Sequence, residues 1–500
     1  MNRCHATRLR RHRSTPWGIV SIALAASLCG CVVGPDFSRP EPSPAAGYSR
    51  SPVTLPSAGT AEVQQRLIPG EQVVSEWWVL FHSTELDATL ATAVAGSPTL
   101  DTARATLAEA QQAILATRGA LYPQVGIEAG ATRARAPTSQ AGTMGHVVGN
   151  LFSIGPTVSF DADLFGGIRR QVEQQSAIAQ FERYELAAAW LSLTGNVVMQ
   201  CLDIASARAQ ILALKEIIST DEHNLELVQI AREAGKAATL DVLSAQSQLA
   251  ADRALLPPLE QQLAAAADAL TILVGKTPAE WKPPHFELDH FSLPAELPVS
   301  VPSRFVHDRP DILAAESQLH AANAAIGVAT AQLYPDITLS ASWTQAATTT
   351  GALFEGANGV WSLAAGLTAP LFHGGALEAQ RQAAVDAYAA QLGVYRQTVL
   401  IAFGQVADTL RALKHDAEAL DAQRNALDTA RASLELSQES YRFGESSFLQ
   451  VLVAQRLFGE ARLGYARAQG QRYLDSAQLF VAMGGGWQAW DEDPASPARQ

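Results

Sequence analysis

The sequence contains one segment twice, and this repetition decides the fold class. "SPTLDTARATLAEAQQAILATRGALYPQV" occupies Ser97–Val125, and "RPDILAAESQLHAANAAIGVATAQLYPDI" occupies Arg309–Ile337, 212 residues later. Both copies have proline in second place, and both end in Leu-Tyr-Pro, a polar residue and a β-branched residue. A constant spacing over so many residues indicates an internal repeat.

The repetition continues through most of the chain. "DLFGG" at Asp163–Gly167 corresponds to "PLFHGG" at Pro370–Gly375, and "AREAGKAATLDVLSAQ" (Ala231–Gln246) corresponds to "SYRFGESSFLQVLVAQ" (Ser440–Gln455). We expect each half to run helix, two strands, long helix, helix. The predicted fold class is mixed α and β, with mostly long α-helices, four strands and two structural repeats. The expected divisions are a signal peptide (1–30), an N-terminal lipid-anchored segment (31–84), the first repeat (85–282), a proline-rich bridge (283–303), the second repeat (304–486) and a C-terminal tail (487–500).

Four stretches alternate apolar and polar residues with a period of two, as strands with one apolar face do. Ile337, Leu339, Ala341 and Trp343 alternate with serine and threonine, and similar patterns cover 125–131, 152–162 and 361–367. These stretches are about as long as tilted membrane strands. The alternation fits a half-buried soluble sheet equally well, but the N-terminal signal described below favours a membrane barrel.

Four strands cannot close a barrel, and hydrocarbon does not tolerate open sheet edges. Two copies of the chain would supply eight strands, whose interior is filled by side chains, whereas three copies would supply twelve strands and leave a lumen. We therefore expect a homotrimer. In such a barrel, Asp161 and Asp163 would face the lumen or its mouth.

Two long helices are expected to follow the strands. Residues 167–230 contain no proline and one internal glycine, which corresponds to a helix of roughly 95 Å at about 1.5 Å per residue. Gly235 and Gly444 stand where each long helix should end and the chain should turn back, as glycine does at helix C-termini. Pro257-Pro258 predicts a kink or break in the first returning helix only.

The N-terminus has the features of an export signal. Residues 1–30 begin with arginines and continue with an apolar run that is too short for a spanning helix. The sequence Leu28-Cys29-Gly30-Cys31 resembles a bacterial lipobox. This resemblance implies cleavage before Cys31, attachment of lipid to Cys31 and anchoring in outer membrane lipid. Cys201 would then be the only free cysteine, so no intrachain disulfide is expected.

The composition and motifs exclude several function classes. The net charge of −13 disfavours nucleic-acid binding, because an acidic surface repels phosphates. The sequence contains no His-Glu-x-x-His, Cys-x-x-Cys or Gly-x-Ser-x-Gly motif. His285 and His290 in the bridge have no convincing partner ligands. We therefore expect no catalytic residues, no metal and no cofactor.

The motifs together resemble TolC-type outer membrane efflux proteins, in particular the lipoprotein branch of RND efflux systems that includes OprM- and NodT-like proteins. The resemblance rests on "GCVVGPDFSRP" after the signal, the paired "LYP" motifs, "DLFGG" and "LFHGG", "FGQVAD" at 403–408 and "GGGW" at 484–487. It covers nearly all of residues 31–487.

The resemblance implies a trimer with a twelve-stranded β-barrel in the outer membrane and a helical tunnel in the periplasm. Such a trimer is a passive exit duct for drugs or other small toxic compounds. Its partners would be a periplasmic adaptor protein and an inner-membrane RND pump. Two alternatives remain open, namely a type I secretion duct for polypeptides and a non-conducting periplasmic coiled-coil spacer.

The resemblance also implies roles for residues near the turns of the helices. The turns at Gly235 and Gly444 would dock the adaptor. Tyr441 corresponds to the family's inner-helix tyrosine and Asp241 to its acidic partner, so a hydrogen bond between these two side chains is expected to hold the closed gate.

Other gate positions depart from the family pattern. Ser446 stands where a basic residue is expected, and the acidic rings of the family's entrance fall on Gln450 and Val453. Leu449 keeps an apolar constriction position, and Arg456 keeps a basic one. We therefore expect the entrance to close more by apolar packing than by charge.

Overall fold

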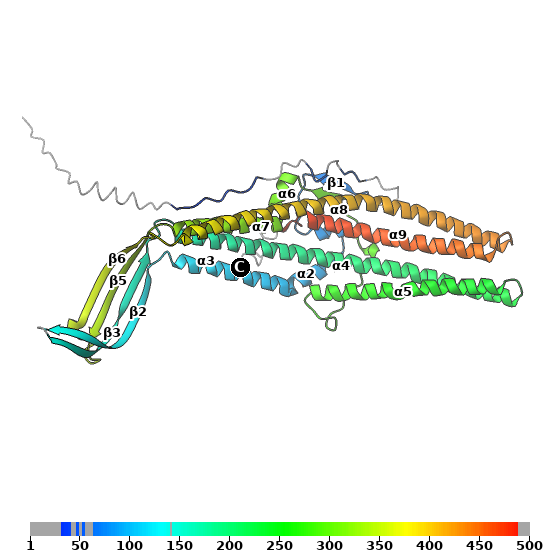
Figure 1. Ribbon diagram of the computed structural model, residues 1–500. Helices are drawn as coiled ribbons and strands as arrows, with labels where there is room; N and C mark the ends of the chain where they lie inside the picture. The colour runs from blue at the N-terminus through cyan, green and yellow to red at the C-terminus, as the bar shows by residue number, and fades with distance from the viewer. Residues whose placement is uncertain (1–31, 42–46, 50–52, 56–63, 141–142, 489–500) are drawn as a thin grey trace, which may run out of the picture. The chain divides into compact units, whose positions relative to one another are not determined.

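The structure is a computed structural model that describes residues 32–41, 47–49, 53–55, 64–140 and 143–488. The order helix, two strands, long helix, helix occurs in both halves of the chain (Figure 1). In the first half the elements are α2 (Thr84–Gly96), α3 (Pro98–Gly119), β2 (Gln124–Gln140), β3 (Thr143–Asp161), α4 (Gly167–Glu233) and α5 (Thr239–Leu273). In the second half they are α6 (Pro302–Asp308), α7 (Pro310–Ala331), β5 (Asp336–Ala347), β6 (Gly359–Thr368), α8 (Ala376–Arg442) and α9 (Phe448–Ala482).

Corresponding helices of the two halves have equal lengths. Helices α3 and α7 have 22 residues each, α4 and α8 have 67, and α5 and α9 have 35. The smaller elements are β1 (Arg66–Pro69), β4 (Glu296–Val299) and the 3-10 helices η1 (Trp77–Phe81), η2 (Leu288–His290) and η3 (Gly356–Asn358).

The chain divides into two compact units. The sheet unit comprises residues up to Arg39, Glu109–Ala179 and Ser317–Leu392. The helical unit comprises Pro40–Ala108, Gln180–Glu316 and Gly393 onward.

The sheet unit contains one antiparallel sheet with the strand order β2-β3-β5-β6. The pairing of β3 with β5 is interrupted at Gly155-Pro156, because proline has no N–H to donate. Within the described chain, β2 pairs only with β3, and β6 pairs only with β5. Every residue of β6 is exposed, including Trp361, Leu363 and Leu367. The sheet therefore has two open edges and an uncovered apolar surface.

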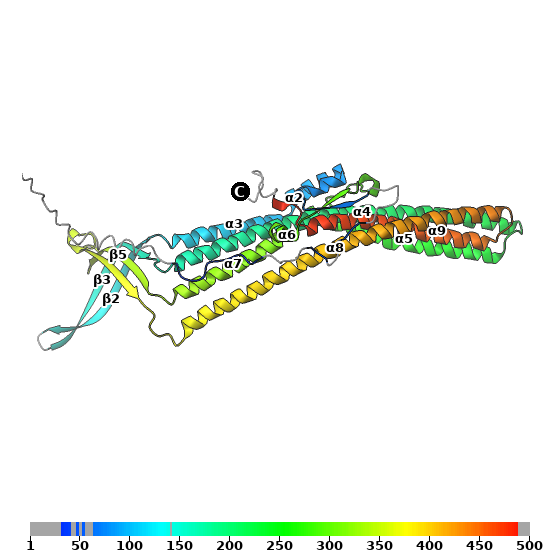
Figure 2. The same cartoon turned by 90° about the horizontal axis from the view of Figure 1, so that it is seen from above.

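The helical unit is built on two antiparallel helix pairs, in which α5 folds back along α4 and α9 folds back along α8 (Figures 1 and 2). Its largest buried side chains include Trp77, Phe81 and Phe480, and the rings of Trp77 and Phe480 are stacked with centroids 5.1 Å apart. Strand β1 pairs in parallel with β4. The C-terminal Trp487 donates from Nε1 to the carbonyl oxygen of Asp308 at 2.6 Å, which fixes the "GGGW" motif against the start of the second half.

Of the kink or break predicted at Pro257-Pro258, the break is wrong, because α5 is helical from Thr239 to Leu273. Both prolines lie on the exposed side of the helix. The backbone carbonyls that lose their intrahelical donors there can accept from water. The cost of the two prolines is therefore too small to end the helix.

Cys201 is a free, fully buried thiol in α4, as the apolar surroundings of this residue predict. Burial raises the pKa of the Cys201 thiol well above its usual value.

Candidate functional site

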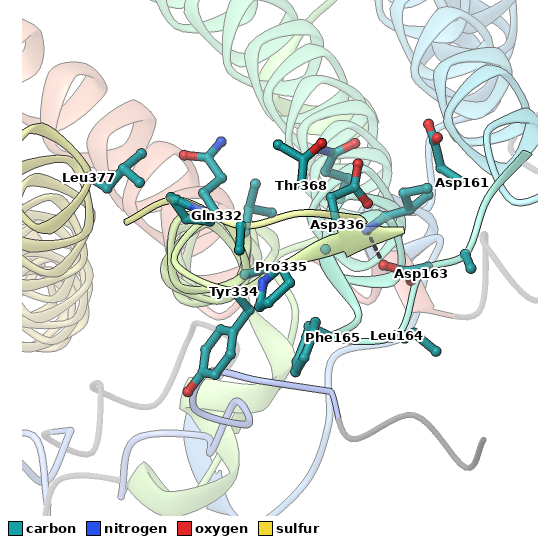
Figure 3. Close-up of a pocket in the computed structure, with 18 of the residues that line it drawn as sticks. Asp161, Asp163, Leu164, Phe165, Gln332, Tyr334, Pro335, Asp336, Thr368 and Leu377 are labelled. Carbon is teal, nitrogen blue, oxygen red and sulfur yellow. Dashed lines mark hydrogen bonds between the residues drawn. The ribbon is translucent and has the colours of Figure 1, made fainter. Parts of the chain in front are cut away.

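A cavity of about 480 Å³ lies in the sheet unit, where the strands join the helices (Figure 3). Asp161, the last residue of β3, lines this cavity together with Asp336, and its Oδ1 accepts a hydrogen bond from Thr338 Oγ1 at 3.0 Å. The rings of Phe165 and Tyr334 stack at 4.7 Å along the same cavity. Phe165 belongs to "DLFGG" and Tyr334 to the second "LYP" motif, so these two motifs meet at the junction.

Asp163 has a different environment from the one that strand alternation predicts. It lies beyond the end of β3, and its carboxylate accepts from the backbone N–H groups of Ile168 and Arg169 at 3.0 Å each. Arg169 Nε also donates to it at 3.0 Å, and the Asp163 side chain is only 11% exposed. The carboxylate therefore stabilises the first turn of α4, where an anion is favoured by the unpaired N–H groups. This bonding gives Asp163 a structural role at the start of α4.

Sequence reasoning missed a segment that connects residues 32–37 to the helices of the sheet unit, and we call this segment the strap. Arg170 donates from Nε to the carbonyl oxygen of Val33 at 3.1 Å, and from Nη2 to Gly34 O and Asp36 Oδ1. Phe37 stacks on His320 with ring centroids 4.4 Å apart. The signal in the sequence was the "GPDF" tetrapeptide at 34–37, two residues after the lipobox.

The expected lipidation site, Cys31, lies outside the described residues, as do the signal peptide and residues 489–500. The described strap begins at the next residue, Val32.

The two predicted turns have the same backbone structure. Gly235 and Gly444 have φ values of +72° and +75°, a region that favours glycine. At the first turn, Lys236 N donates to Ala231 O at 2.8 Å, and at the second, Glu445 N donates to Ser440 O at 2.9 Å. These are the hydrogen bonds of a Schellman motif, so both long helices end in the same way.

The predicted hydrogen bond between Tyr441 and Asp241 is absent from the described chain. Asp241 is the third residue of α5, and its Oδ2 accepts from the backbone N–H of Ala238 at 2.9 Å. The Tyr441 ring packs instead against Phe448, with centroids 5.6 Å apart, and against Leu452. The carboxylate is therefore used to satisfy the start of its own helix, and the tyrosine is held by apolar contacts.

The remaining predicted gate residues lie along one side of α9. Leu449 and Val453 are 55% and 44% exposed, and together with Gln450 they line a groove of about 270 Å³ that also borders α8. Arg456 lies on the same helix and pairs with Glu460 at 2.6 Å. Ser446 Oγ approaches Ser437 O at 3.5 Å. Leu449 and Val453 thus form an exposed apolar patch beside this groove.

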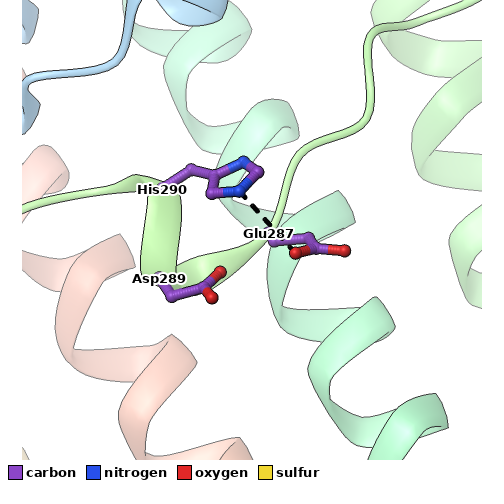
Figure 4. Close-up of side chains that lie close together, drawn as sticks. All are labelled: Glu287, Asp289 and His290. Atoms are coloured by element: carbon purple, nitrogen blue, oxygen red, sulfur yellow. Dashed lines mark ion pairs between the residues drawn. The ribbon is translucent and has the colours of Figure 1, made fainter.

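The bridge contains a small group of possible metal ligands, Glu287, Asp289 and His290, whose ligand atoms lie within 4.8 Å of one another (Figure 4). His285 Nε2 also lies 3.2 Å from Glu287 Oε1. Asp289 and His290 are exposed, and the contacts are those of surface ion pairs. The geometry does not require a metal.

Comparison with known proteins agrees with this architecture. The family model for outer membrane efflux proteins matches residues 89–276 and 301–485. The chain is 31% identical over 497 residues to the toluene efflux pump outer membrane protein TtgF of Pseudomonas putida, covering 95% of this chain and 98% of that protein. It is 30% identical over 423 residues to the pyoverdine export outer membrane protein OpmQ of Pseudomonas aeruginosa, covering 83% and 88%.

Solved structures give the same result. The outer-membrane channel OprN superposes with a TM-score of 0.82 at 26% identity, covering 92% of this chain and all of that chain. The open state of the MtrE outer membrane channel of Neisseria gonorrhoeae superposes with a TM-score of 0.77 at 25% identity, covering 91% and 99%. With matches over both halves, the chain belongs to the outer membrane efflux protein family, and it is the outer-membrane channel component of an efflux system.

Proposed function

We propose that three copies of the chain assemble into a passive exit duct, in which three four-stranded sheets form a twelve-stranded barrel. The observation that carries this proposal is the pair of open edges on β2 and β6, beside the exposed apolar side chains of β6. Open edges are not tolerated in lipid, and twelve strands leave a lumen that eight do not. The match of the family model to both halves and the equal helix lengths support two repeats, bounded as 85–282 and 304–486.

The trimer is tested by native mass determination of the full chain in detergent. Three chains per particle are expected, and a monomer or dimer contradicts the proposal. Asp161, the acidic residue at the end of β3, is proposed to face the lumen of this trimer.

The anchor is proposed to be lipid on Cys31 after removal of residues 1–30, which places the chain in the outer membrane with its helices in the periplasm. Labelled palmitate should enter the wild type but not Cys31→Ser. The matched control is Cys29→Ser, which removes a neighbouring thiol and should still be labelled. Labelling of Cys31→Ser would overturn the anchor.

The transported compounds are proposed to be drugs or other small toxic compounds, delivered by an inner-membrane RND pump through a periplasmic adaptor. Relatives are named for toluene efflux, pyoverdine export and cation efflux, which supports small solutes over polypeptides. Deletion should sensitise cells to toxic compounds and leave protein secretion intact. The opposite pattern favours the type I secretion alternative, and an absence of conductance in planar bilayers favours a non-conducting spacer.

The adaptor is proposed to dock at the turns around Gly235 and Gly444. An added Cβ at either glycine meets no atom within 4 Å, so only the positive φ restricts the residue type. Gly444→Val should distort the turn and weaken crosslinking to the adaptor, while Gly444→Asn, which tolerates positive φ, should preserve it. The same pair of variants at Gly235 tests the first turn, and unchanged crosslinking in both valine variants removes the turns from the interface.

The entrance is proposed to close by packing of Leu449 and Val453 from three chains. Because both side chains are exposed in the single chain, aspartate there leaves folding intact but repels its copies in a trimer. Leu449→Asp should therefore raise single-channel conductance. Gln450→Asp, which adds an acidic ring without removing apolar surface, should mainly increase block by multivalent cations. Wild-type conductance in Leu449→Asp would contradict apolar closure.

A further inference from the structure

An aspartate occupies a core position of the helical unit. Asp221 continues the apolar series Leu214 and Ile218 at helical spacing on α4, and the series ends at Val228. Asp221 is only 3% exposed. Leu214 and Ile218 form a buried cluster with Leu249 of α5 on one side, and Val228 belongs to a second buried cluster on the other. A buried carboxylate at such a position needs donors to compensate for lost water.

Only one of the two carboxyl oxygens of Asp221 has a donor. Gln455 of α9 donates from Nε2 to Asp221 Oδ1, and the Oε1 atom of Gln455 in turn accepts from Asn224. Asp221 Oδ2 is buried and has no hydrogen-bond partner among the described residues. The carboxyl group of Asp252 on α5 lies beside the Asp221 carboxyl group. Two ionised carboxylates would present only acceptors to each other.

The partner carboxyl group is itself fixed in place. Gln248, one turn earlier on α5, donates from Nε2 to Asp252 Oδ2 at 2.8 Å. Arg253 follows Asp252 in sequence but pairs with Glu222 on the exposed side of the helices. Among the described residues, the side chains that act on the Asp221 carboxyl group are Asp252 and the neutral Gln455, and neither is a cation.

A second pair with the same construction lies between the other two helices. Asp416 of α8 contacts Asp475 of α9, and Asp416 Oδ2 is buried without a hydrogen-bond partner among the described residues. Gln471, one turn before Asp475, donates to Asp475 Oδ2 at 3.2 Å, as Gln248 does to Asp252. Among the described residues, Arg472 is a further charged group that acts on Asp416, and its Nε donates to Gln65.

We propose that each aspartate pair, Asp221 with Asp252 and Asp416 with Asp475, is a proton-binding site that holds one shared proton at neutral pH. The orphaned Oδ2 of Asp221 or Asp416 carries the proton, and its O–H donates to a carboxylate oxygen of Asp252 or Asp475, which satisfies the orphaned atom and removes one of two adjacent like charges. The proton thereby bridges α4 to α5 and α8 to α9. This inference does not depend on the transported compound or on the pump.

The charge environment agrees with this assignment. Burial raises the pKa of Asp221 to about 8, and the adjacent Asp252 acts in the same direction. Burial and Asp475 likewise raise the pKa of Asp416 to about 8, although Arg472 acts in the opposite direction.

A divalent cation suits the sites less well than a proton. Calcium takes about six to eight oxygen ligands, and magnesium retains several waters. In the first pair, the amides of Gln455 and Gln248 already donate to one oxygen of Asp221 and one of Asp252. Because Asp221 is only 3% exposed, little room remains for water bound to a metal.

The sites should make the helix pairs sensitive to alkaline pH. The folded-state pKa lies above that of the unfolded chain, so the folded protein binds more protons between the two values. The stabilisation is fully present below the unfolded pKa of about 4 and is lost as the pH rises through the folded pKa. Wild-type protein should therefore melt at a lower temperature at pH 9 than at pH 6.

The test measures the melting temperature of the full chain in detergent across this pH range. Asp221→Asn supplies an uncharged donor to Asp252 at every pH, so roughly half of the pH-dependent shift should disappear while the second pair remains. The matched control is Asp386→Asn, because Asp386 is exposed and accepts from Gln382 one turn earlier without facing another carboxyl group. This control should retain the wild-type shift.

Equal pH-dependent shifts in the wild type and Asp221→Asn would overturn the proposal. If Asp221→Asn does not fold, Asp252→Asn changes the less buried partner of the same pair. Infrared spectra of the wild type provide a test without substitution, because a shared proton gives a carboxylic-acid C=O band at pH 7 that disappears at alkaline pH. The absence of this band overturns the proposal, as does a melting temperature that rises with calcium and falls with a chelator at constant pH.

Discussion

Helix pairs α4–α5 and α8–α9 have the same lengths but different surroundings. The most apolar 18-residue window of α4 has a mean hydropathy of 1.4 and is 67% buried, whereas α8 exposes Leu400 and Ile401. Leu191 and Leu400 are both the twenty-fifth residue of their helices, yet they are 8% and 67% exposed. Helices of equal length can therefore pack in different surroundings. Helix α4 lies in the core of its own chain, whereas α8 presents an apolar face that another copy can cover.

The largest effect on stability is expected at Leu191, the buried leucine of this pair. Leu191→Ala should lower the free energy of unfolding by about 2–5 kcal/mol, because it leaves a cavity in a packed core. Leu400→Ala should change the free energy of unfolding of the chain by less than about 0.5 kcal/mol but reduce the fraction of trimer. Urea unfolding and native mass determination measure the two effects, and equal losses of folding stability would contradict the comparison.

The returning helices differ in how closely they approach α4. Gly470 of α9 is buried, and an added Cβ would lie 2.1 Å from Ser206 Oγ. Gln261 is the corresponding residue of α5 and is exposed. Gly470→Val should cost about 1–3 kcal/mol through overpacking, measured by thermal or urea unfolding. Gln261→Val is the control, and a comparable loss there would show that the helix propensity of valine, not contact, is responsible.

The starts of the two long helices also differ. Asp163 accepts from the first turn of α4, whereas the segment Pro370–Gly375 before α8 contains no acidic residue. Asp163→Ala should therefore destabilise the chain by about 1 kcal/mol, as the loss of a helix cap does. Asp161→Ala removes the same charge nearby, at a residue whose side chain accepts from Thr338, and should have a smaller effect. Equal effects on the melting temperature would show that net charge, and not capping, is measured.

The smallest expected effect is at the turn of α8. Tyr441→Phe should change stability and single-channel conductance little, because Tyr441 contributes its ring to the contacts with Phe448 and has no bond to Asp241. Tyr441→Ala should change both more, through lost packing. A large conductance increase in Tyr441→Phe would restore the hydroxyl to a role in closure.

The strands, the long helices and the turns could be predicted from the sequence, because each has a local signal. Strands show alternation, helices show periodicity, and the turns show a glycine where each long helix ends. The side-chain partners were harder to predict. Tyr441 and Asp241 both lie within six residues of the glycine of their turn, but this spacing does not reveal that the Asp241 carboxylate accepts from the start of its own helix. Likewise, Asp163 continues the alternation of β3 after the strand has ended. The Arg170 contacts join residues more than 130 positions apart, and no local pattern marks such a pairing.

The strap has a mechanical consequence. Gly34 lies so close to α7 that an added Cβ would be 2.5 Å from Gly327 Cα. The Arg170 guanidinium donates to the carbonyl oxygens of both Val33 and Gly34. If Cys31 carries lipid as proposed, a force that the membrane exerts on this residue is transmitted to α4 and α7 through a short, tightly held segment of three residues. Arginine suits this position because its planar fork holds several donors in fixed directions, whereas the donors of the lysine ammonium rotate on a flexible stem. The membrane attachment would then be rigid and resist torque, rather than act as a flexible tether.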